Sequence, residues 1–338
     1  MAGIIFSEAS GVNKSVYGMC QAPIQMFIES YDTELQSNSM LPKLFKMYDS
    51  QNFADYMGEM TPMSGPQPVG ENGAYPKDNM QEGFGKMVQY DTWKDSFSIS
   101  EDMMEDDKVL DLTSAPQTFM DAWHLTRESF GAAIFGGALK QQKTMKFRGR
   151  EFDISSADGQ SVFHIAHAPK TKGSKQSNCF SNAFSVDALD MAETAMQQFK
   201  GENDQQMTVA PDTIVIANQA SLKRKVFAAI GSDIDPVMST HAFNYQYGRW
   251  TVIIWPFLNQ FIGKGSEPWM LMDSKFNQRY GGAVWGDRLK MKLKSAVVDD
   301  PGANVWYGRG RWTGTFRNWR AFCAGGITGG TDLTTMGL

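Results

Sequence analysis

Mostly apolar residues recur at helical spacing near the middle of the chain, and this pattern predicts its longest helix. The recurring positions are Phe119, Trp123, Thr126, Phe130 and Ile134. They fall on one face of a helix with 3.6 residues per turn. Ser114-Ala115-Pro116 is typical of a helix start, because serine caps free N–H groups and proline suits the first turn. The pattern ends near Gly136-Gly137.

An alternating pattern before this helix predicts a long strand. From Gly85 to Ser100, apolar side chains occupy one parity, with interruptions at Val88 and Tyr90. The apolar positions are Met87, Trp93, Phe97 and Ile99. Residues 61–76, which precede the strand, hold four prolines and three glycines, so regular structure stops there. Because a lone ribbon is marginal in water, we expect another surface to cover this one.

The second half of the chain predicts a mixed α/β domain over residues 186–300. Its expected elements are a helix over 186–199, a strand over 213–217, a helix over 220–230, and strands over 250–255 and 269–272. Before this domain, residues 155–185 are rich in Ser, Lys, Gly and Asn and predict a loop or crossover. After it, aromatic residues alternate with small or basic ones, which indicates strands that return to a sheet.

Composition and cysteine usage set the class of protein. Of the 338 residues, 42% are hydrophobic and 20% are charged, which is typical of a globular chain. The net charge of −5 argues against a dedicated nucleic-acid binder. Cys20, Cys179 and Cys323 are too far apart to indicate a disulfide framework. Residues 1–10 lack the features of a signal peptide, and no apolar run is long enough for a membrane span, so we expect a soluble protein made in a cytoplasm.

The motifs of common enzyme classes are missing from the sequence. It contains no phosphate-binding P-loop, no G-x-S-x-G elbow and no G-x-G-x-x-G fingerprint. His164 and His167 lie three residues apart with Cys179 downstream, but zinc sites usually show tighter paired spacing, so ordinary solvated histidines are favoured. We therefore predict no catalytic, cofactor or metal site. A metal-dependent hydrolase that uses these three side chains stays open as an alternative.

Charge is distributed unevenly along the chain. Residues 65–107 hold ten acidic residues against three lysines, whereas residues 279–320 hold nine basic residues against three acidic ones. Opposite charges on one polypeptide favour head-to-tail association between copies. Pairing of the two segments within one subunit is an equal alternative. Nonspecific contact of the basic segment with nucleic-acid phosphates is a weaker one.

The order of these segments resembles a known fold. An N-terminal arm, an extended ribbon, a long helix, an α/β domain and late strands resemble the subunit of tailed-phage shells, the Hong Kong ninety-seven phage capsid fold. More specifically, the sequence resembles the Mu-like prophage major head subunit family from its first residues to about Gly326. The matching stretches are residues 70–75, 90–98, 157–160, 209–216, 227–231, 247–250 and 281–285.

The resemblance implies an α+β fold with five parts. They are an N-terminal arm over 1–60, an extension loop (β-hairpin) over 61–107, a peripheral domain with a spine helix over 108–185, an axial domain over 186–300 and C-terminal strands returning to the peripheral/axial sheet over 301–338. This chain has no obvious N-terminal scaffold extension, so we expect a separate scaffolding protein. Some relatives cross-link loop lysines, but nothing identifies the partner asparagine for Lys77, Lys86 or Lys94, so no cross-link is predicted.

The resemblance also implies a function that is not enzymatic. It implies the major capsid protein of a tailed bacteriophage or prophage, made in the bacterial host cytoplasm and located in the virion. Hexamers and pentamers of the chain would close into an icosahedral shell around double-stranded DNA. A portal protein is a further implied partner, and a decoration protein is left open. The alternative with the same fold is an encapsulin, a bacterial shell that holds enzyme cargo.

Candidate contacts between subunits follow from these expectations. Trp93, Phe97 and Ile99 are expected to bury against a neighbouring subunit, because the extension loop cannot bury its own apolar face. The acidic candidates are Glu101, Asp102, Asp106 and Asp107. Their candidate counterparts are Arg309, Arg311 and Arg317.

Overall fold

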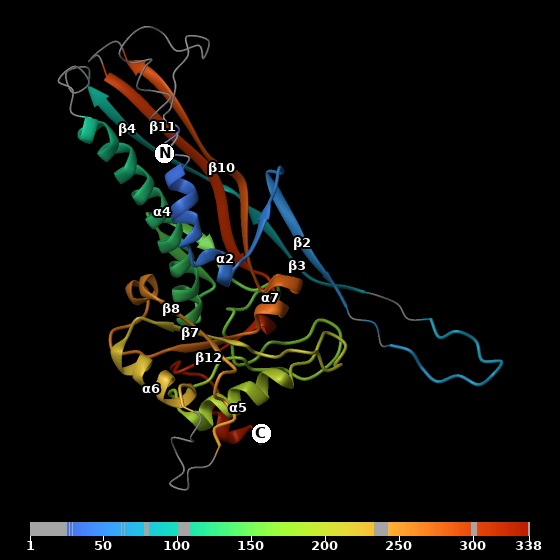
Figure 1. Cartoon of the computed structure of the whole chain (residues 1–338). Coiled ribbons are helices and arrows are strands. Elements are labelled where there is room, and N and C mark those ends of the chain that lie inside the picture. Colours follow the sequence, from blue (N-terminus) through green and yellow to red (C-terminus); the bar gives the residue numbers. More distant parts are fainter. Residues whose placement is uncertain are drawn as a thin grey trace.

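Two four-stranded sheets and a projecting hairpin organise the chain (Figure 1). The computed structural model describes residues 26, 28, 30–61, 63, 65–77, 81–100, 109–232, 243–298 and 303–336. The first sheet, in the order β1-β10-β11-β4, runs beside the long helix α4, and the second, β12-β9-β7-β8, lies at the lower end of the molecule in Figure 1.

The first sheet brings three distant parts of the chain together. Its strands are β1 (Lys46–Asp49), β4 (Asp91–Ser100), β10 (Ala283–Val298) and β11 (Ala303–Phe316). β11 pairs antiparallel with both β10 and β4, and β1 pairs parallel with β10. The predicted return of late strands to a sheet is therefore confirmed, and β4, which lies within the acidic segment, pairs with β11 of the basic segment inside one chain.

The predicted long helix is confirmed as α4 (Val109–Leu139). It runs along the first sheet in Figure 1 and ends close to the predicted position. Its start was predicted wrongly, because the helix already exists at Val109 and Pro116 lies inside it. Local capping signals are weak, and the long adjacent sheet gives the helix a surface to follow beyond the proline.

An aromatic layer joins this helix to the sheet. Trp93 of β4 stacks on Trp312 of β11 with 4.9 Å between ring centroids. Phe97 of β4 stacks on Trp306 of β11 at 5.1 Å, and Phe119 of α4 packs against Phe97. Trp93, Phe97, Trp306 and Trp312 occupy alternate positions, so they share the sheet face that α4 covers.

The second sheet confirms the predicted α/β elements. Its strands are β7 (Thr213–Ala217), β8 (Thr251–Trp255), β9 (Trp269–Met272) and β12 (Phe322–Gly325). The surrounding helices are α5 (Val186–Gln197), α6 (Ala220–Ile230) and α7 (Ser274–Tyr280). β7 pairs parallel with β8 and antiparallel with β9, and the C-terminal strand β12 completes the edge. All five residues of β7 are buried, as expected for a continuous apolar run.

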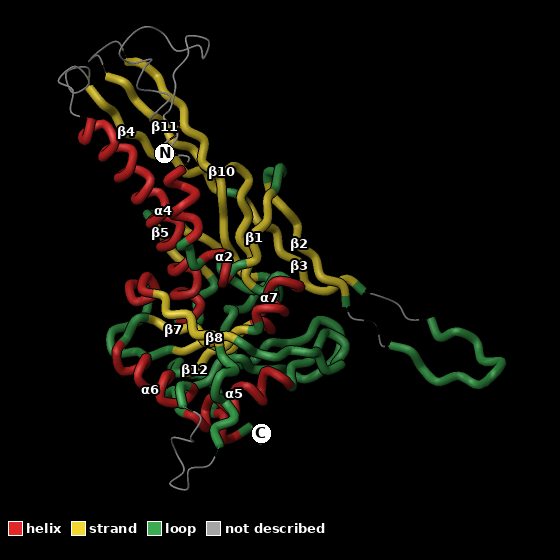
Figure 2. The backbone as a smooth tube through the Cα atoms, viewed as in Figure 1, coloured by secondary structure: helices red, strands yellow, loops and turns green. Residues whose placement is uncertain are grey.

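A hairpin formed by β2 (Ala54–Met60) and β3 (Glu82–Gln89) projects from the body. The loop between its strands extends further from the body, as Figure 2 shows. The expected β-hairpin over 61–107 therefore has different bounds, because β2 precedes that range and β4 belongs to the first sheet. The predicted strand from Gly85 to Ser100 is two strands with different partners. Alternation indicates an extended chain but does not identify the strand that it pairs with.

The remaining elements are short. They are α2 (Leu41–Leu44), β5 (Thr144–Phe147), β6 (Arg150–Asp153), η2 (Pro256–Gln260), η3 (Trp319–Ala321) and η4 (Leu333–Thr335). Residues 155–185 contain only isolated bridges such as His167 with Gln176, as expected for the predicted loop or crossover.

Candidate functional site

The outward face of the β2–β3 hairpin is apolar and exposed. Tyr56 and Met87 are cross-strand partners, and they are 61% and 70% exposed. Met60 continues this face along β2. The Tyr56 ring lies across Gly85, at a position that a side chain there would occupy, and its hydroxyl donates to Glu82 Oε1 at 2.8 Å. We call Tyr56, Met60 and Met87 the hairpin face.

The loop beyond the hairpin extends this exposed apolar surface. Its exposed large apolar residues are Met63, Val69 and Tyr75. Tyr75 is 95% exposed, so its ring makes almost no contact with its own chain. Exposed apolar groups gathered on one projecting element indicate an interaction site.

A second candidate surface is a row of cations on the open face of the first sheet. Arg309 of β11 is the cross-strand partner of Lys94 in β4 and of Lys292 in β10. These three side chains and Lys294 line a shallow hollow of about 730 Å³, together with the carboxylate of Asp95. We call Lys94, Lys292, Lys294 and Arg309 the basic strip. Trp93 and Phe97 point to the sheet face that α4 covers. Lys94 has the opposite parity, so the strip is on the face away from α4.

Charge on the basic strip is not neutralised by ion pairs within the described residues. Like charges directly opposite one another destabilise a sheet. The neighbouring Arg311 has a lowered pKa, because of desolvation first and then because of repulsion from Arg288 and Arg309. An anionic partner from outside the described chain would relieve this repulsion.

The predicted apolar contact residues lie inside the chain. Ile99 is buried, and Trp93 and Phe97 stack within the aromatic layer. The reason for expecting them at a subunit interface, that they cannot be buried within their own chain, is therefore wrong. Alternation correctly identified their parity, but the surface that covers them is α4 of the same chain.

The predicted charged residues divide into three cases. Glu101, Asp102, Asp106 and Asp107 lie outside the described residues. Arg309 belongs to the basic strip, and Arg311 lies beside it. Arg317 is turned toward its own hairpin, where its Nη2 donates to Gly58 O at 2.7 Å. The intersubunit roles themselves stay predictions.

Sequence reasoning missed Tyr56, Met60, Met87, Lys292 and Lys294 as surface residues. Parity contains the signal for the two lysines, because they alternate with Met291 and Leu293 along β10. Tyr56 and Met60 lie two positions either side of Gly58, which also indicates one strand face. Neither pattern indicates which strand face is exposed to solvent, so these surfaces could be identified only in the folded chain.

The lysines near the extension loop differ in accessibility. Lys77 and Lys94 are exposed, whereas Lys86 is 8% exposed and points into the body. Burial lowers the pKa of Lys86, while the nearby Asp153 opposes that effect.

The histidines considered for metal binding have a structural arrangement. His167 is buried, its Nδ1 lies 2.5 Å from Asp158 Oδ2, and its ring stacks on Trp319 at 4.2 Å. The solvated setting expected for this histidine is therefore wrong. Burial raises the pKa of Cys179 to about 12. In the described part of the chain, no three side chains of the His, Cys, Asp and Glu types converge closely enough to hold a metal ion.

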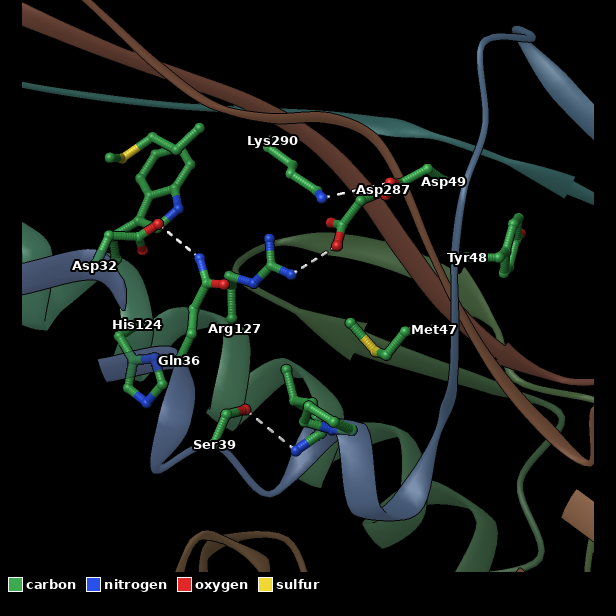
Figure 3. Close-up of a pocket in the computed structure, with 14 residues that line it drawn as sticks. Asp32, Gln36, Ser39, Met47, Tyr48, Asp49, His124, Arg127, Asp287 and Lys290 are labelled. Atoms are coloured by element: carbon green, nitrogen blue, oxygen red, sulfur yellow. Dashed lines mark hydrogen bonds and ion pairs between the residues drawn. The ribbon is translucent and has the colours of Figure 1, made fainter. Parts of the chain in front are cut away.

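A cleft of about 410 Å³ lies between residues 32–49, α4 and β10 (Figure 3). Four of its charged groups form two ion pairs. Arg127 Nη2 lies 2.9 Å from Asp287 Oδ2, and Lys290 Nζ lies 3.3 Å from Asp49 Oδ2. Gln36 donates to Asp32 Oδ2 at 2.6 Å, and burial raises the pKa of Asp32. Lys290 with Asp49, and Met40 N with Glu128 Oε1 at 3.0 Å, link residues 32–49 to the body, so we assign the cleft a structural role.

No helix among the described residues is both long enough and apolar enough to span a bilayer.

Comparisons with known proteins identify the fold. No protein-family model and no curated protein matches the sequence. The capsid structure of the cyanophage P-SCSP1u aligns over 84% of this chain and 86% of its own, with a TM-score of 0.50 and 9% identity. The capsid of Ralstonia phage GP4 aligns over 82% and 84%, with a TM-score of 0.48 and 11% identity. For the mature capsid of bacteriophage PhiM1, the values are 85%, 86%, 0.47 and 9%.

The alignment with the cyanophage capsid shows that the chain has the fold of a phage capsid protein. This confirms the predicted α+β capsid fold. The more specific resemblance to the Mu-like head subunits stays a prediction.

Proposed function

We propose that this chain is the major capsid protein of a tailed bacteriophage or prophage, a shell subunit and not an enzyme. The observation that carries the proposal is the capsid fold, which extends over 84% of the chain. In the proposed assembly, hexamers and pentamers close into an icosahedral shell around double-stranded DNA. The protein is then located in the virion after synthesis in the host cytoplasm.

The hairpin face supports self-assembly. Tyr56, Met60 and Met87 expose apolar area on an element that projects from the body. Burial of apolar area stabilises an interface by about 25 cal/mol per Å² before the cost of association is subtracted. In the proposed shell this face lies on a neighbouring copy. Because every subunit makes several such contacts at once, the closed shell dissociates slowly.

The basic strip supports a second contact. We propose that acidic residues 101, 102, 106 and 107 of a neighbouring copy approach the side of the sheet that carries Arg309 and Arg311. Arg317 leaves the set of counterparts, because it already binds its own hairpin. Charge reversal at both Asp106 and Asp107 tests this contact through the yield of assembled shells. Unchanged assembly would contradict the electrostatic part of the proposal.

The finer identity is also proposed. As a Mu-like head subunit, the chain depends on a separate scaffolding protein and a portal protein, and a decoration protein is left open. In this assignment α4 is the spine helix of a peripheral domain, and the sheet β12-β9-β7-β8 forms the axial domain.

Electron microscopy of the purified chain, together with its sedimentation profile, tests the proposed function. We expect closed uniform shells or rings of five and six subunits, alone or after coexpression with the scaffolding protein. A homogeneous monomer under both conditions would contradict the proposal. Nucleic acid that survives nuclease treatment inside the shells indicates a phage capsid, whereas enzyme cargo without DNA indicates an encapsulin.

A further inference from the structure

The hairpin lies outside the connected hydrophobic core, although Val88 of β3 is buried with 4% of its surface exposed. Phe45 before it and Ile99 after it belong to the connected hydrophobic core. Among the described residues, none from Ala54 to Gln89 belongs to that core or packs against it as a partly buried apolar side chain. A two-stranded ribbon alone is marginal in water, so the orientation of the hairpin depends on other contacts.

Polar contacts hold both strands of the hairpin. Arg317 donates to Gly58 O of β2 at 2.7 Å, and Asn318 Nδ2 donates to Glu59 Oε1 at 2.9 Å. Lys170 Nζ donates to Gly83 O of β3 at 2.6 Å. Both arginine and lysine donors here come from the body and reach outward to the hairpin backbone.

Lys86 makes the reverse contact, from the hairpin into the body. Its Nζ donates to Ser155 O at 2.5 Å and to Thr315 Oγ1 at 2.8 Å, and it lies 3.3 Å from Asp153 Oδ2. Thr315 belongs to β11, Asp153 is the last residue of β6 and Ser155 follows β6, so one ammonium group joins β3 to two other stretches of the chain. An ammonium group has three donors, and all of them have acceptors here.

We propose that Lys86 is a positioning residue, a latch that fixes the angle between the hairpin and the body before the subunit meets another copy. A hairpin that is already fixed loses less conformational entropy on docking, which strengthens the contact. The latch holds the hairpin face in one orientation in the free chain. Its consequence for assembly rests on the proposed function, but the latch itself belongs to the single chain.

Amide hydrogen exchange of the free chain tests the latch. In Lys86→Met, which keeps an unbranched side chain but removes the ammonium group, we expect the amides of β3 to exchange about tenfold faster or more. Exchange in β7 should stay as in the wild type. Lys94→Met is the matched control, because it removes an exposed lysine without an ion pair in the described chain, and it should leave β3 unchanged.

A second variant guards against a general loss of folding. Thr315→Val keeps the shape of the side chain and removes one acceptor of Lys86, so we expect a smaller acceleration that is also confined to the hairpin. Unchanged exchange of β3 in Lys86→Met would overturn the latch. If Lys86→Met loosens the whole chain, hairpin-limited acceleration in Thr315→Val supports the latch, and unchanged or uniform exchange in that variant overturns it.

Assembly of Lys86→Met tests the positioning role separately. If the wild type forms shells, we expect this variant to form fewer closed shells and more irregular ones. Normal shells at normal yield, made by a variant with a loosened hairpin, would overturn the positioning role. Failure of the wild type to form shells would contradict the proposed function, while the exchange experiment would still decide whether the latch exists.

Discussion

Two antiparallel strand pairs in this molecule are stabilised in opposite ways. The pair β10–β11 is covered by α4 and carries Trp306 and Trp312 in a buried aromatic layer. The pair β2–β3 contributes nothing to the connected core within the described residues and is held by polar contacts. An antiparallel strand pair is therefore part of the folded body in one case and a projecting hairpin in the other.

Stability of the single chain and association between copies therefore depend on different surfaces of the molecule. Buried aromatic contacts stabilise the single chain, because they remove large apolar areas from water and add favourable ring geometry. The exposed hairpin face adds little to the single chain and remains available to another surface. Three variants test this separation, and a fourth, Asp158→Asn, tests a buried polar contact of the body; they follow in order of their expected effect on the free energy of unfolding.

Trp312→Ala should have the largest effect. This side chain is buried, stacks on Trp93 at 4.9 Å and meets Trp123 edge-on at 5.1 Å. We expect the free energy of unfolding to fall by about 3–5 kcal/mol, as for other large-to-small changes in a core. Urea unfolding followed by circular dichroism measures it. Tyr75→Ala is the control and should change stability by less than about 0.5 kcal/mol. If both variants lost the same free energy of unfolding, the contrast between the buried aromatic layer and the exposed loop would be contradicted.

Asp158→Asn should have the next largest effect, and that effect should depend on pH. Burial raises the pKa of Asp158, but the hydrogen bond and charge of His167 outweigh it, so the pKa lies below its ordinary value of 3.8. The folded state thus binds this proton less readily than the unfolded state. The stabilisation is complete above the ordinary pKa and is lost as the pH falls through the lowered pKa.

We therefore expect Asp158→Asn to lower the free energy of unfolding by about 1.5–3 kcal/mol at pH 7, the range for a hydrogen bond to a charged group. The difference in the free energy of unfolding between variant and wild type should become smaller in acid. Urea unfolding at pH 7 and at an acidic pH measures this difference. Asp95→Asn, at an exposed position, serves as the control. A gap of constant size at both pH values would mean that the contact with His167 does not stabilise the charged carboxylate.

Arg309→Glu should stabilise the single chain slightly while weakening association. It replaces the repulsion with Lys94 and Lys292 by attraction, which is worth about 0.2–1 kcal/mol in a cross-strand pair. Unfolding experiments at low salt measure the gain, and sedimentation measures the loss of shells. Arg309→Gln should show a smaller change in the same direction. A destabilised chain would mean that the strip is already neutralised within the subunit.

The double variant Tyr56→Ser with Met87→Ser should have the smallest effect on folding and a large effect on assembly. Both side chains are mostly exposed, so we expect the free energy of unfolding to change by less than about 0.5 kcal/mol per site. Electron microscopy should show few or no closed shells. Normal assembly of this variant would contradict the role of the hairpin face.

The sequence was most informative where the apolar pattern of one element is long or continuous. The run over residues 213–217 and the periodic residues of α4 predicted a strand and a helix that the structure contains. The start of α4 was missed because a local proline signal competed with a long neighbouring sheet. The candidate site was predicted less well. Arg309 was identified, but Lys292, Lys294 and the hairpin face were not.

Trp93 and Met87 illustrate the boundary between the two sources of information. Both lie in one alternating stretch of apolar and polar positions, yet Trp93 stacks inside the body and Met87 is exposed on the hairpin. The residue pattern was enough to predict the extended conformation, the parity of each side chain and the surplus of charge in two segments. The pairing of the strands, the apolar face that α4 covers and the identity of the buried lysine became clear from the folded chain. The physical reason is that periodicity follows from local backbone geometry, whereas burial depends on surfaces contributed by residues far away in the chain.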